Sequence, residues 1–187
     1  MATVRRMRES DLSDVEYVCR VTAGVEESPD PAAKIIMTRM FSTYYVRECH
    51  SNSFVLADEN DKAVGYLLCE PDYKRFNKIF RRIDVPEISA VNKKSGFRAW
   101  TFPIPYNILG RKYPAHLHID LLPEYQGKGY GKIMIETLLD DLKEKKVKGI
   151  MLMASAQNTG AIRFYTRLGF KTLLSALGTV VMVKNII

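Results

Sequence analysis

The spacing of apolar and polar residues predicts a strand over residues 2–7, followed by a helix that begins near Asp11. Val15, Val18 and Cys19 recur at helical spacing and give this helix one apolar stripe. The chain therefore opens with a strand and a helix that has a single face for a core.

Ser13 and Glu16 have the spacing of a capping box at the start of that helix. A second helix is predicted over residues 32–48, after Pro31, which suits the first turn of a helix. Its apolar positions recur every three or four residues: Ile35, Ile36, Met40 and Tyr44.

Two strand-like runs come next, SFVLAD and AVGYLLCE, and the polar stretch ENDK between them predicts a β-hairpin. Residues 72–83 then alternate as an amphipathic helix does, with apolar and basic residues on opposite faces. The pattern of the remainder of residues 71–114 is irregular, and it predicts no particular element.

From Ala115 onwards the pattern is regular. It predicts a strand over residues 116–122, a helix over 130–146, a buried strand over 150–155 and a helix over 159–168, with a last strand near 179–183. A strand, helix and strand in this order form a right-handed crossover with parallel or mixed pairing. We therefore expect an α/β fold, in one domain that spans residues 1–187.

The positive charge is concentrated in one segment. Residues 71–115 carry ten of the 28 Lys and Arg residues but three of the 21 acidic ones, so the net charge of +7 falls in this segment. Cationic walls would favour an acidic partner. No nucleic-acid-binding motif accompanies the charge, so a nucleic-acid partner is not favoured.

Cysteine usage and hydropathy indicate an intracellular, cytoplasmic protein. Cys19, Cys49 and Cys69 are widely spaced and form no C-x-x-C pair, so neither a disulfide framework nor a zinc knuckle is predicted. No apolar run reaches the roughly 18 residues that a membrane span needs, and the first twenty residues lack the apolar core of a signal peptide. We therefore expect no membrane partner.

The stretch YQGKGYGK, residues 125–132, places three glycines between a predicted strand and a predicted helix. Backbone N–H groups converge at a helix start, so this loop can hold an anion such as a phosphate. It is neither a dinucleotide fingerprint, because Lys132 replaces the third glycine, nor a Walker loop, because Ile133 replaces the Ser or Thr. The alternative is a tight turn that binds no ligand.

Two motifs resemble the GNAT superfamily of acyl-CoA-dependent N-acyltransferases. Gln126, Gly129 and Gly131 match its Q/R-x-x-G-x-G/A loop, and NTGAIRFYTRLGF, residues 158–170, resembles its second signature. The resemblance is specific over residues 115–171. It implies a three-layer fold with a mixed, splayed central sheet, and acetyl-CoA as the co-substrate.

The resemblance also implies the roles of individual residues. The backbone of Leu121 and Leu122 would pair with the pantetheine arm, and Asn158 and Phe164 would contact the cofactor. Tyr165 would protonate the departing thiolate. The loop that would hold the pyrophosphate consists of Gln126, Gly127, Lys128, Gly129, Tyr130, Gly131 and Lys132.

The stretch HLHID carries the candidate general base. Alternate residues of a strand share a face, so His116, His118 and Asp120 lie on one side of it. Proton removal from an amine needs a base, and we expect Asp120 or His118 to serve, with Asp120 acting directly or orienting a histidine. Two alternatives are a metal site and structurally hydrogen-bonded histidines. Because a tetrahedral site needs three or four converging ligands and only His50 remains to join, we predict no metal.

Within the superfamily, YPAHLHIDLLPEYQGKGYGK resembles the acetyltransferase-like domain of O-GlcNAc hydrolases and its stand-alone bacterial relatives. We predict transfer of an acetyl group to a small-molecule or protein amine by direct attack, with residues 71–114 near the acceptor groove. The alternative is a non-catalytic acyl-CoA-binding or protein-interaction module.

Overall fold

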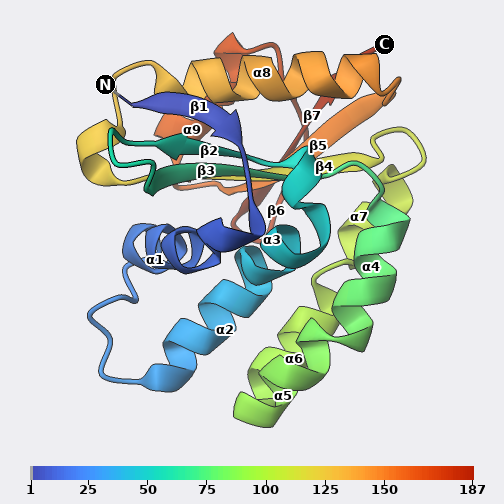
Figure 1. The fold of residues 1–187 in the computed structure, drawn as a ribbon. Coiled ribbons are helices and arrows are strands. Elements are labelled where there is room, and N and C mark those ends of the chain that lie inside the picture. Colours follow the sequence, from blue (N-terminus) through green and yellow to red (C-terminus); the bar gives the residue numbers. More distant parts are fainter. Residues whose placement is uncertain (1) are drawn as a thin grey trace.

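The computed structural model describes residues 2–187, without the side chains of residues 105 and 106. Within these residues one sheet is flanked by helices (Figure 1). The strands are β1 (Thr3–Arg6), β2 (Phe54–Ala57), β3 (Ala63–Glu70), β4 (Ala115–Leu121), β5 (Gly149–Ser155), β6 (Lys171–Ala176) and β7 (Thr179–Asn185). The helices are α1 (Leu12–Thr22), α2 (Pro31–Phe41), α3 (Thr43–Cys49), α4 (Tyr73–Arg82), α5 (Asp84–Val91), α6 (Lys93–Thr101), α7 (Ile104–Leu109), α8 (Tyr130–Glu144) and α9 (Thr159–Arg167).

The sheet has the order β1-β2-β3-β4-β5-β7-β6, and every neighbouring pair is antiparallel except β4 and β5. These two parallel strands pair only at Ala115–Ile150 and His116–Met151, and beyond His116 the strands separate. The predicted α/β class and the mixed, splayed sheet are therefore confirmed.

Helices cover both faces of the sheet. In Figure 1, α1 to α3 lie below it and α8 lies above it. Met134, Ile135 and Leu138 of α8 are fully buried, as the apolar stripe of this helix predicts. The carboxylate of Asp141 accepts a hydrogen bond from Arg6 at 2.7 Å, which ties α8 to β1.

Two predictions about the first helices are wrong in detail. The capping box of Ser13 and Glu16 does not form, because Glu16 instead accepts a hydrogen bond from the hydroxyl of Thr43 at 2.7 Å. The helix predicted over 32–48 is broken into α2 and α3 at buried Ser42, whose φ of −132° is not helical and whose hydroxyl donates to the carbonyl of Thr38. The apolar period continues through this break, so the pattern alone does not reveal it.

Residues 71–114 form four helices, α4 to α7, between β3 and β4. The N–H of Tyr73 donates to the carbonyl of Pro114 at 2.9 Å, so the two ends of the segment meet. Buried Glu70 accepts hydrogen bonds from Arg75, from Tyr44 and from Cys49. This cluster anchors α4 to β3 and α3, and it neutralises one positive charge of the basic segment.

The hairpin of β6 and β7 forms one end of the sheet, next to β5. The sequence pattern does not predict β6. The turn of the hairpin uses Leu177 and Gly178, both with positive φ, which suits a tight hairpin. β6 is an exposed edge strand with leucines at Leu173 and Leu174, so it lacks the alternation that marks a half-buried strand.

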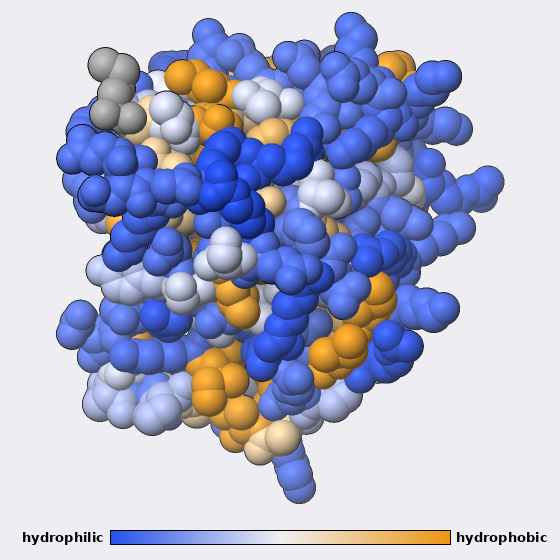
Figure 2. Space-filling model, in the orientation of Figure 1, coloured by the Kyte–Doolittle hydropathy of each residue, from blue (hydrophilic) through white to orange (hydrophobic). Residues whose placement is uncertain are grey.

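The surface drawn in Figure 2 is mostly hydrophilic, and its hydrophobic areas are separate. Among the described residues, no helix is both long and apolar enough to cross a membrane.

Candidate functional site

The glycine loop joins the end of β4 to the start of α8. Gly127 and Gly129 have φ values of 71° and 86°, a conformation that other residues rarely adopt, and a Cβ at either position would meet no atom within 4 Å. Gly129 precedes the first turn of α8, and its carbonyl accepts the N–H groups of Lys132 and Ile133, whereas the helix offers no acceptor to the N–H groups before them. The loop therefore presents open backbone at the positive end of a helix dipole.

A cleft of about 820 Å³ runs along this loop, and we call it the glycine-loop cleft. Most of the predicted binding residues line it: Asp120, Leu121, Gln126, Gly127, Gly129, Gly131, Lys132, Asn158, Phe164 and Tyr165. Further lining residues, none of them among the predicted site residues, are Ile119, Tyr125, Gly160, Ala161, Arg167 and Leu168.

Three predicted binding residues, Leu122, Lys128 and Tyr130, are not among the residues that line the cleft. The N–H of Leu122 already donates to the carbonyl of Val64 at 3.0 Å, so it continues the pairing with β3. Lys128 and Tyr130 flank Tyr125 instead, with the Lys128 Nζ 5.8 Å from the centre of its ring. The backbones of Lys128 and Tyr130 nevertheless belong to the loop between the lining residues Gly127, Gly129 and Gly131, so the role of their N–H groups stays a prediction.

The splay of the sheet positions the rest of the cleft. Because β4 leaves β5 after His116, the backbone of β4 up to Leu121 has an edge open towards β5. The side chain of Gln126 donates to the carbonyl of Leu121 at 2.8 Å, which fixes the loop against the end of β4. On the opposite wall, Asn158 accepts the N–H of Ala161 at 2.9 Å and caps α9.

Close packing brings the two motifs together. A Cβ on Gly131 would lie 3.3 Å from the Phe164 ring, so α8 and α9 approach each other here because residue 131 has no side chain. Tyr165, next to Phe164, is buried and also lines the cleft. Burial raises the pKa of Tyr165, so its hydroxyl stays protonated at neutral pH.

Asp120 is the residue at which two hollows meet. It lines the glycine-loop cleft and also a second, smaller hollow on the other side, which we call the Asp120 cavity. The hydroxyl of buried Tyr66, on β3, donates to its carboxylate at 2.5 Å. Loss of water contact raises the pKa of Asp120 to about 6, and the Tyr66 hydrogen bond partly opposes this rise. Asp120 is thus ionised at neutral pH but close to its titration range.

His118 shares this face of β4 but differs in its chemistry. Burial lowers its pKa to about 4, so the imidazole is neutral at pH 7 and a weaker base than an ordinary histidine. In the described structure its Nε2 has no hydrogen-bond partner, and no hydrogen bond joins it to Asp120. Its ring packs edge-on against Phe41 and Tyr45. Of the two candidate bases, the geometry favours Asp120.

His116 lies inside the core. Its Nε2 is 2.7 Å from the hydroxyl of Tyr45, and its ring contacts Tyr73 and Phe76. These contacts fit the structural alternative raised for the histidines. Among the described residues, no group of three or more His, Cys, Asp and Glu side chains gathers as a metal site would require.

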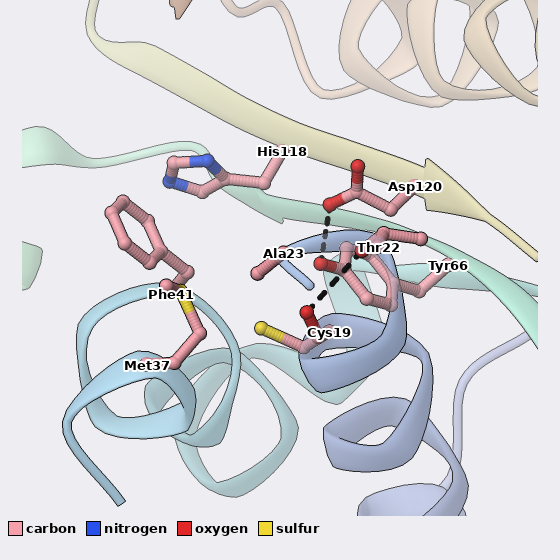
Figure 3. Close-up of a pocket in the computed structure, with 8 residues that line it drawn as sticks. All are labelled: Cys19, Thr22, Ala23, Met37, Phe41, Tyr66, His118 and Asp120. Atoms are coloured by element: carbon pink, nitrogen blue, oxygen red, sulfur yellow. Dashed lines mark hydrogen bonds between the residues drawn. The ribbon is translucent and has the colours of Figure 1, made fainter. Parts of the chain in front are cut away.

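The Asp120 cavity has a volume of about 180 Å³ and lies between β4 and the helices α1 and α2 (Figure 3). It is lined by Cys19, Thr22, Ala23, Met37, Phe41, Tyr66, His118 and Asp120. Most of these residues could not be predicted from the sequence as parts of one site, because they come from four separate elements. One feature of the sequence distinguishes Tyr66: it is the one hydroxyl-bearing residue in the apolar run of β3.

The basic segment, residues 71–114, lies outside the helices that line this cavity. None of the described residues of 71–114 lines the cavity itself. Phe102 instead packs edge-on against Phe41, with ring centres 5.8 Å apart, and Glu87 pairs with Arg39 at 2.8 Å. The segment therefore supports α2 from outside, and it contributes no cation to the cavity wall.

A family model described as "Acetyltransferase (GNAT) family" matches residues 20–170. An uncharacterised N-acetyltransferase of Methanocaldococcus jannaschii is 22% identical over 98% of this chain, but the match covers 67% of that relative.

Two solved structures share the fold. SsHAT superposes with a TM-score of 0.86 and 30% identity, over 100% of this chain and 98% of its own. The PaiA N-acetyltransferase of Thermoplasma acidophilum, solved in complex with coenzyme A, superposes with a TM-score of 0.63 and 16% identity over 99% of both chains. The narrower resemblance to domains of O-GlcNAc hydrolases stays a prediction.

Proposed function

The chain belongs to the acetyltransferase (GNAT) family, and we propose that it is an acetyl-CoA-dependent N-acetyltransferase that works by direct attack of an amine. One observation carries the proposal: Asp120, a carboxylate with a pKa of about 6, borders both the glycine-loop cleft and the Asp120 cavity. A base at this junction can remove a proton from an acceptor in the Asp120 cavity while a cofactor occupies the glycine-loop cleft.

The residues of the glycine-loop cleft fit acetyl-CoA. The open backbone from Gly127 to Gly131 suits a pyrophosphate, and the unpaired edge of β4 suits an extended pantetheine arm. Lys132 and Arg167 add positive charge to the walls. When bound, the cofactor supplies an acetyl group activated as a thioester.

The ammonium form of the amine first releases one proton to water, because the attacking nitrogen needs a free electron pair. Asp120 then accepts the second proton, which the nitrogen loses as it bonds to the acetyl carbon, directly or through one water molecule. The Tyr66 hydrogen bond holds the carboxylate in place and keeps it ionised. His118, neutral at pH 7, forms part of the wall beside the base.

Tyr165 donates a proton to the sulfur as the carbon–sulfur bond breaks. Its raised pKa ensures that the hydroxyl carries this proton before the reaction. Backbone N–H groups at the open edge of β4 can polarise the acetyl carbonyl. Asp120 and Tyr165 then exchange protons with solvent, which restores both groups.

The test is acetylation of a panel of amines by the wild type and by Asp120→Asn, followed by mass spectrometry and CoA release. We expect Asp120→Asn to lower kcat/KM by about 100-fold or more, because general-base catalysis contributes about that much. Its affinity for acetyl-CoA, measured by calorimetry, should change little. Asp140→Asn, an exposed change on α8, is the matched control.

If acetyl-CoA binds and no amine is acetylated, the chain is a non-catalytic acyl-CoA-binding module. Equal turnover by Asp120→Asn and the wild type would remove Asp120 from the mechanism.

A further inference from the structure

The Asp120 cavity has a distinctive charge pattern. Of its eight lining residues, Asp120 alone is ionised at neutral pH, because His118 is neutral and the pKa of the Cys19 thiol is raised by burial to about 11. The remaining side chains are apolar or uncharged. A positively charged amine therefore has one favourable place in this cavity, beside Asp120.

The polar groups of the cavity are largely engaged with the protein. The hydroxyl of Thr22 donates to the carbonyl oxygens of Val18 and Cys19, and the hydroxyl of Tyr66 donates to Asp120, as Figure 3 shows for Thr22 with Cys19 and for Tyr66. The Nε2 of neutral His118 has no partner in the described structure, so one further neutral hydrogen-bonding group on a ligand could be matched here. A second charged group would find no opposite charge among the lining residues, and its burial would weaken binding.

The size of the cavity limits its ligand. A protein cavity of about 150 Å³ accommodates a molecule of the size of benzene. The Asp120 cavity, at about 180 Å³ and open on one side, holds the part of a ligand that enters it, and this part can be slightly larger than benzene. Met37 and Phe41 of α2 form an apolar side opposite β4, and small Ala23 at the end of α1 leaves room beside them.

The nearby basic segment does not change this pattern. Arg75 is held by Glu70 and Glu48, and Arg81 lies over the ring of Trp100 at 4.9 Å. No Lys or Arg is among the cavity-lining residues that the structure describes. A carboxylate on the acceptor would thus meet Asp120 with no cation between them, contrary to the acidic acceptor that the sequence charge favoured.

We propose that the acceptor is a small apolar monoamine: a primary amine on a short hydrocarbon or aryl body, with neither a carboxylate nor a second ammonium on the part that enters the Asp120 cavity. This inference rests on the proposed function. Met37, Phe41 and Ala23 then determine the size of the accepted body.

The experiment compares amines of matched size with the wild-type protein and acetyl-CoA. The apolar probes are 2-phenylethylamine and 3-methylbutylamine, and the charged ones are 4-aminobutanoate and 1,4-diaminobutane. We expect kcat/KM to be about tenfold or more higher for the apolar probes, since each buried extra charge costs more than 1.4 kcal/mol. Preference for either charged probe would overturn the inference and leave the proposed function standing.

A second measurement does not depend on turnover. Calorimetry in the presence of CoA should detect saturable binding of 2-phenylethylamine but not of 4-aminobutanoate. If no amine is acetylated while this difference in binding persists, the proposed function fails and the ligand class stands. If 2-phenylethylamine is neither acetylated nor bound in the calorimetric titration, the proposed ligand class is wrong.

Variants of one helix test the location of the site. Met37→Ala should enlarge the cavity, so that the longer 4-phenylbutylamine fits and the smaller 3-methylbutylamine loses contacts. The ratio of kcat/KM for 4-phenylbutylamine to that for 3-methylbutylamine should rise by about threefold or more, which corresponds to about 0.7 kcal/mol. Met40→Ala, on the same helix but not among the cavity-lining residues, should leave this ratio unchanged. An equal change in both variants would mean that the amine binds elsewhere.

Discussion

The glycine-loop cleft and the Asp120 cavity share one residue but are built differently. The cleft is formed by two short segments, residues 119–132 and 158–168, and glycines of the first expose the backbone. The cavity is formed by side chains of α1, α2, β3 and β4, which are widely separated along the chain. Backbone geometry thus governs one hollow and side-chain volume governs the other, so each should be alterable without the other.

The largest expected effect comes from Gly129→Glu. The new side chain would require a φ of 86° and would place a negative charge at the proposed pyrophosphate site. Loss of two hydrogen bonds to a charged group costs about 3 kcal/mol or more, so acetyl-CoA should bind about 100-fold more weakly by calorimetry. Gly178→Glu, at a φ of 77° in the β6–β7 turn, controls for backbone strain.

If Gly178→Glu weakens binding equally, instability rather than the loop explains the loss. If Gly129→Glu binds acetyl-CoA as the wild type does, the loop is a turn and does not hold the cofactor.

The next effect concerns Tyr165, which belongs to the cleft. Tyr165→Phe removes the proton donor while it retains the buried ring, so kcat should fall by about 100-fold with acetyl-CoA affinity nearly unchanged. A thioester whose thiol is more acidic needs less protonation, and it should recover much of the lost rate in the variant. A rate equal to that of the wild type would mean that solvent protonates the sulfur.

Tyr66→Phe acts on the shared residue and is expected to shift a pH profile. Because Asp120 must be ionised to act as a base and has a pKa of about 6, kcat/KM should rise as the pH increases through 6. The Tyr66 hydrogen bond favours the ionised form, so its removal raises the pKa of Asp120 by about one unit and moves the rise to higher pH.

Titration of the amine itself is the same in wild type and variant, so the difference between the profiles isolates Asp120. Tyr17→Phe, at an exposed position on α1, should leave the profile in place. A Tyr66→Phe profile identical to that of the wild type would mean that the rise comes from another group.

The same contrast explains what the sequence could predict. Gln126, Gly129, Gly131 and Tyr165 lie in two short contiguous motifs, and the alternation of HLHID correctly places His118 and Asp120 on one face of β4. A local pattern is sufficient for these because each lies in a short motif that is recognisable by itself, although the packing of α8 on α9 is what brings the two motifs together.

The cavity could not be predicted in this way. Tyr66 lies 54 positions before Asp120 and meets it only through the pairing of β3 with β4. The break at Ser42, which separates α2 from α3, is not marked by any interruption of the helical period. The sequence likewise shows the positive charge of residues 71–115, but it does not show that this segment packs behind α2.

The smallest expected effect tests whether the basic segment influences the cavity at a distance. Phe102→Ala removes the ring that packs on Phe41, and an aromatic pair of this kind contributes about 1 kcal/mol. Phe41 should then move more freely, so the KM for 2-phenylethylamine should rise by about fivefold while acetyl-CoA affinity stays constant. Phe97→Ala, an exposed ring on α6, is the matched control and should change neither quantity. A change in acetyl-CoA affinity with Phe102→Ala would mean that the two hollows are coupled through more than Asp120.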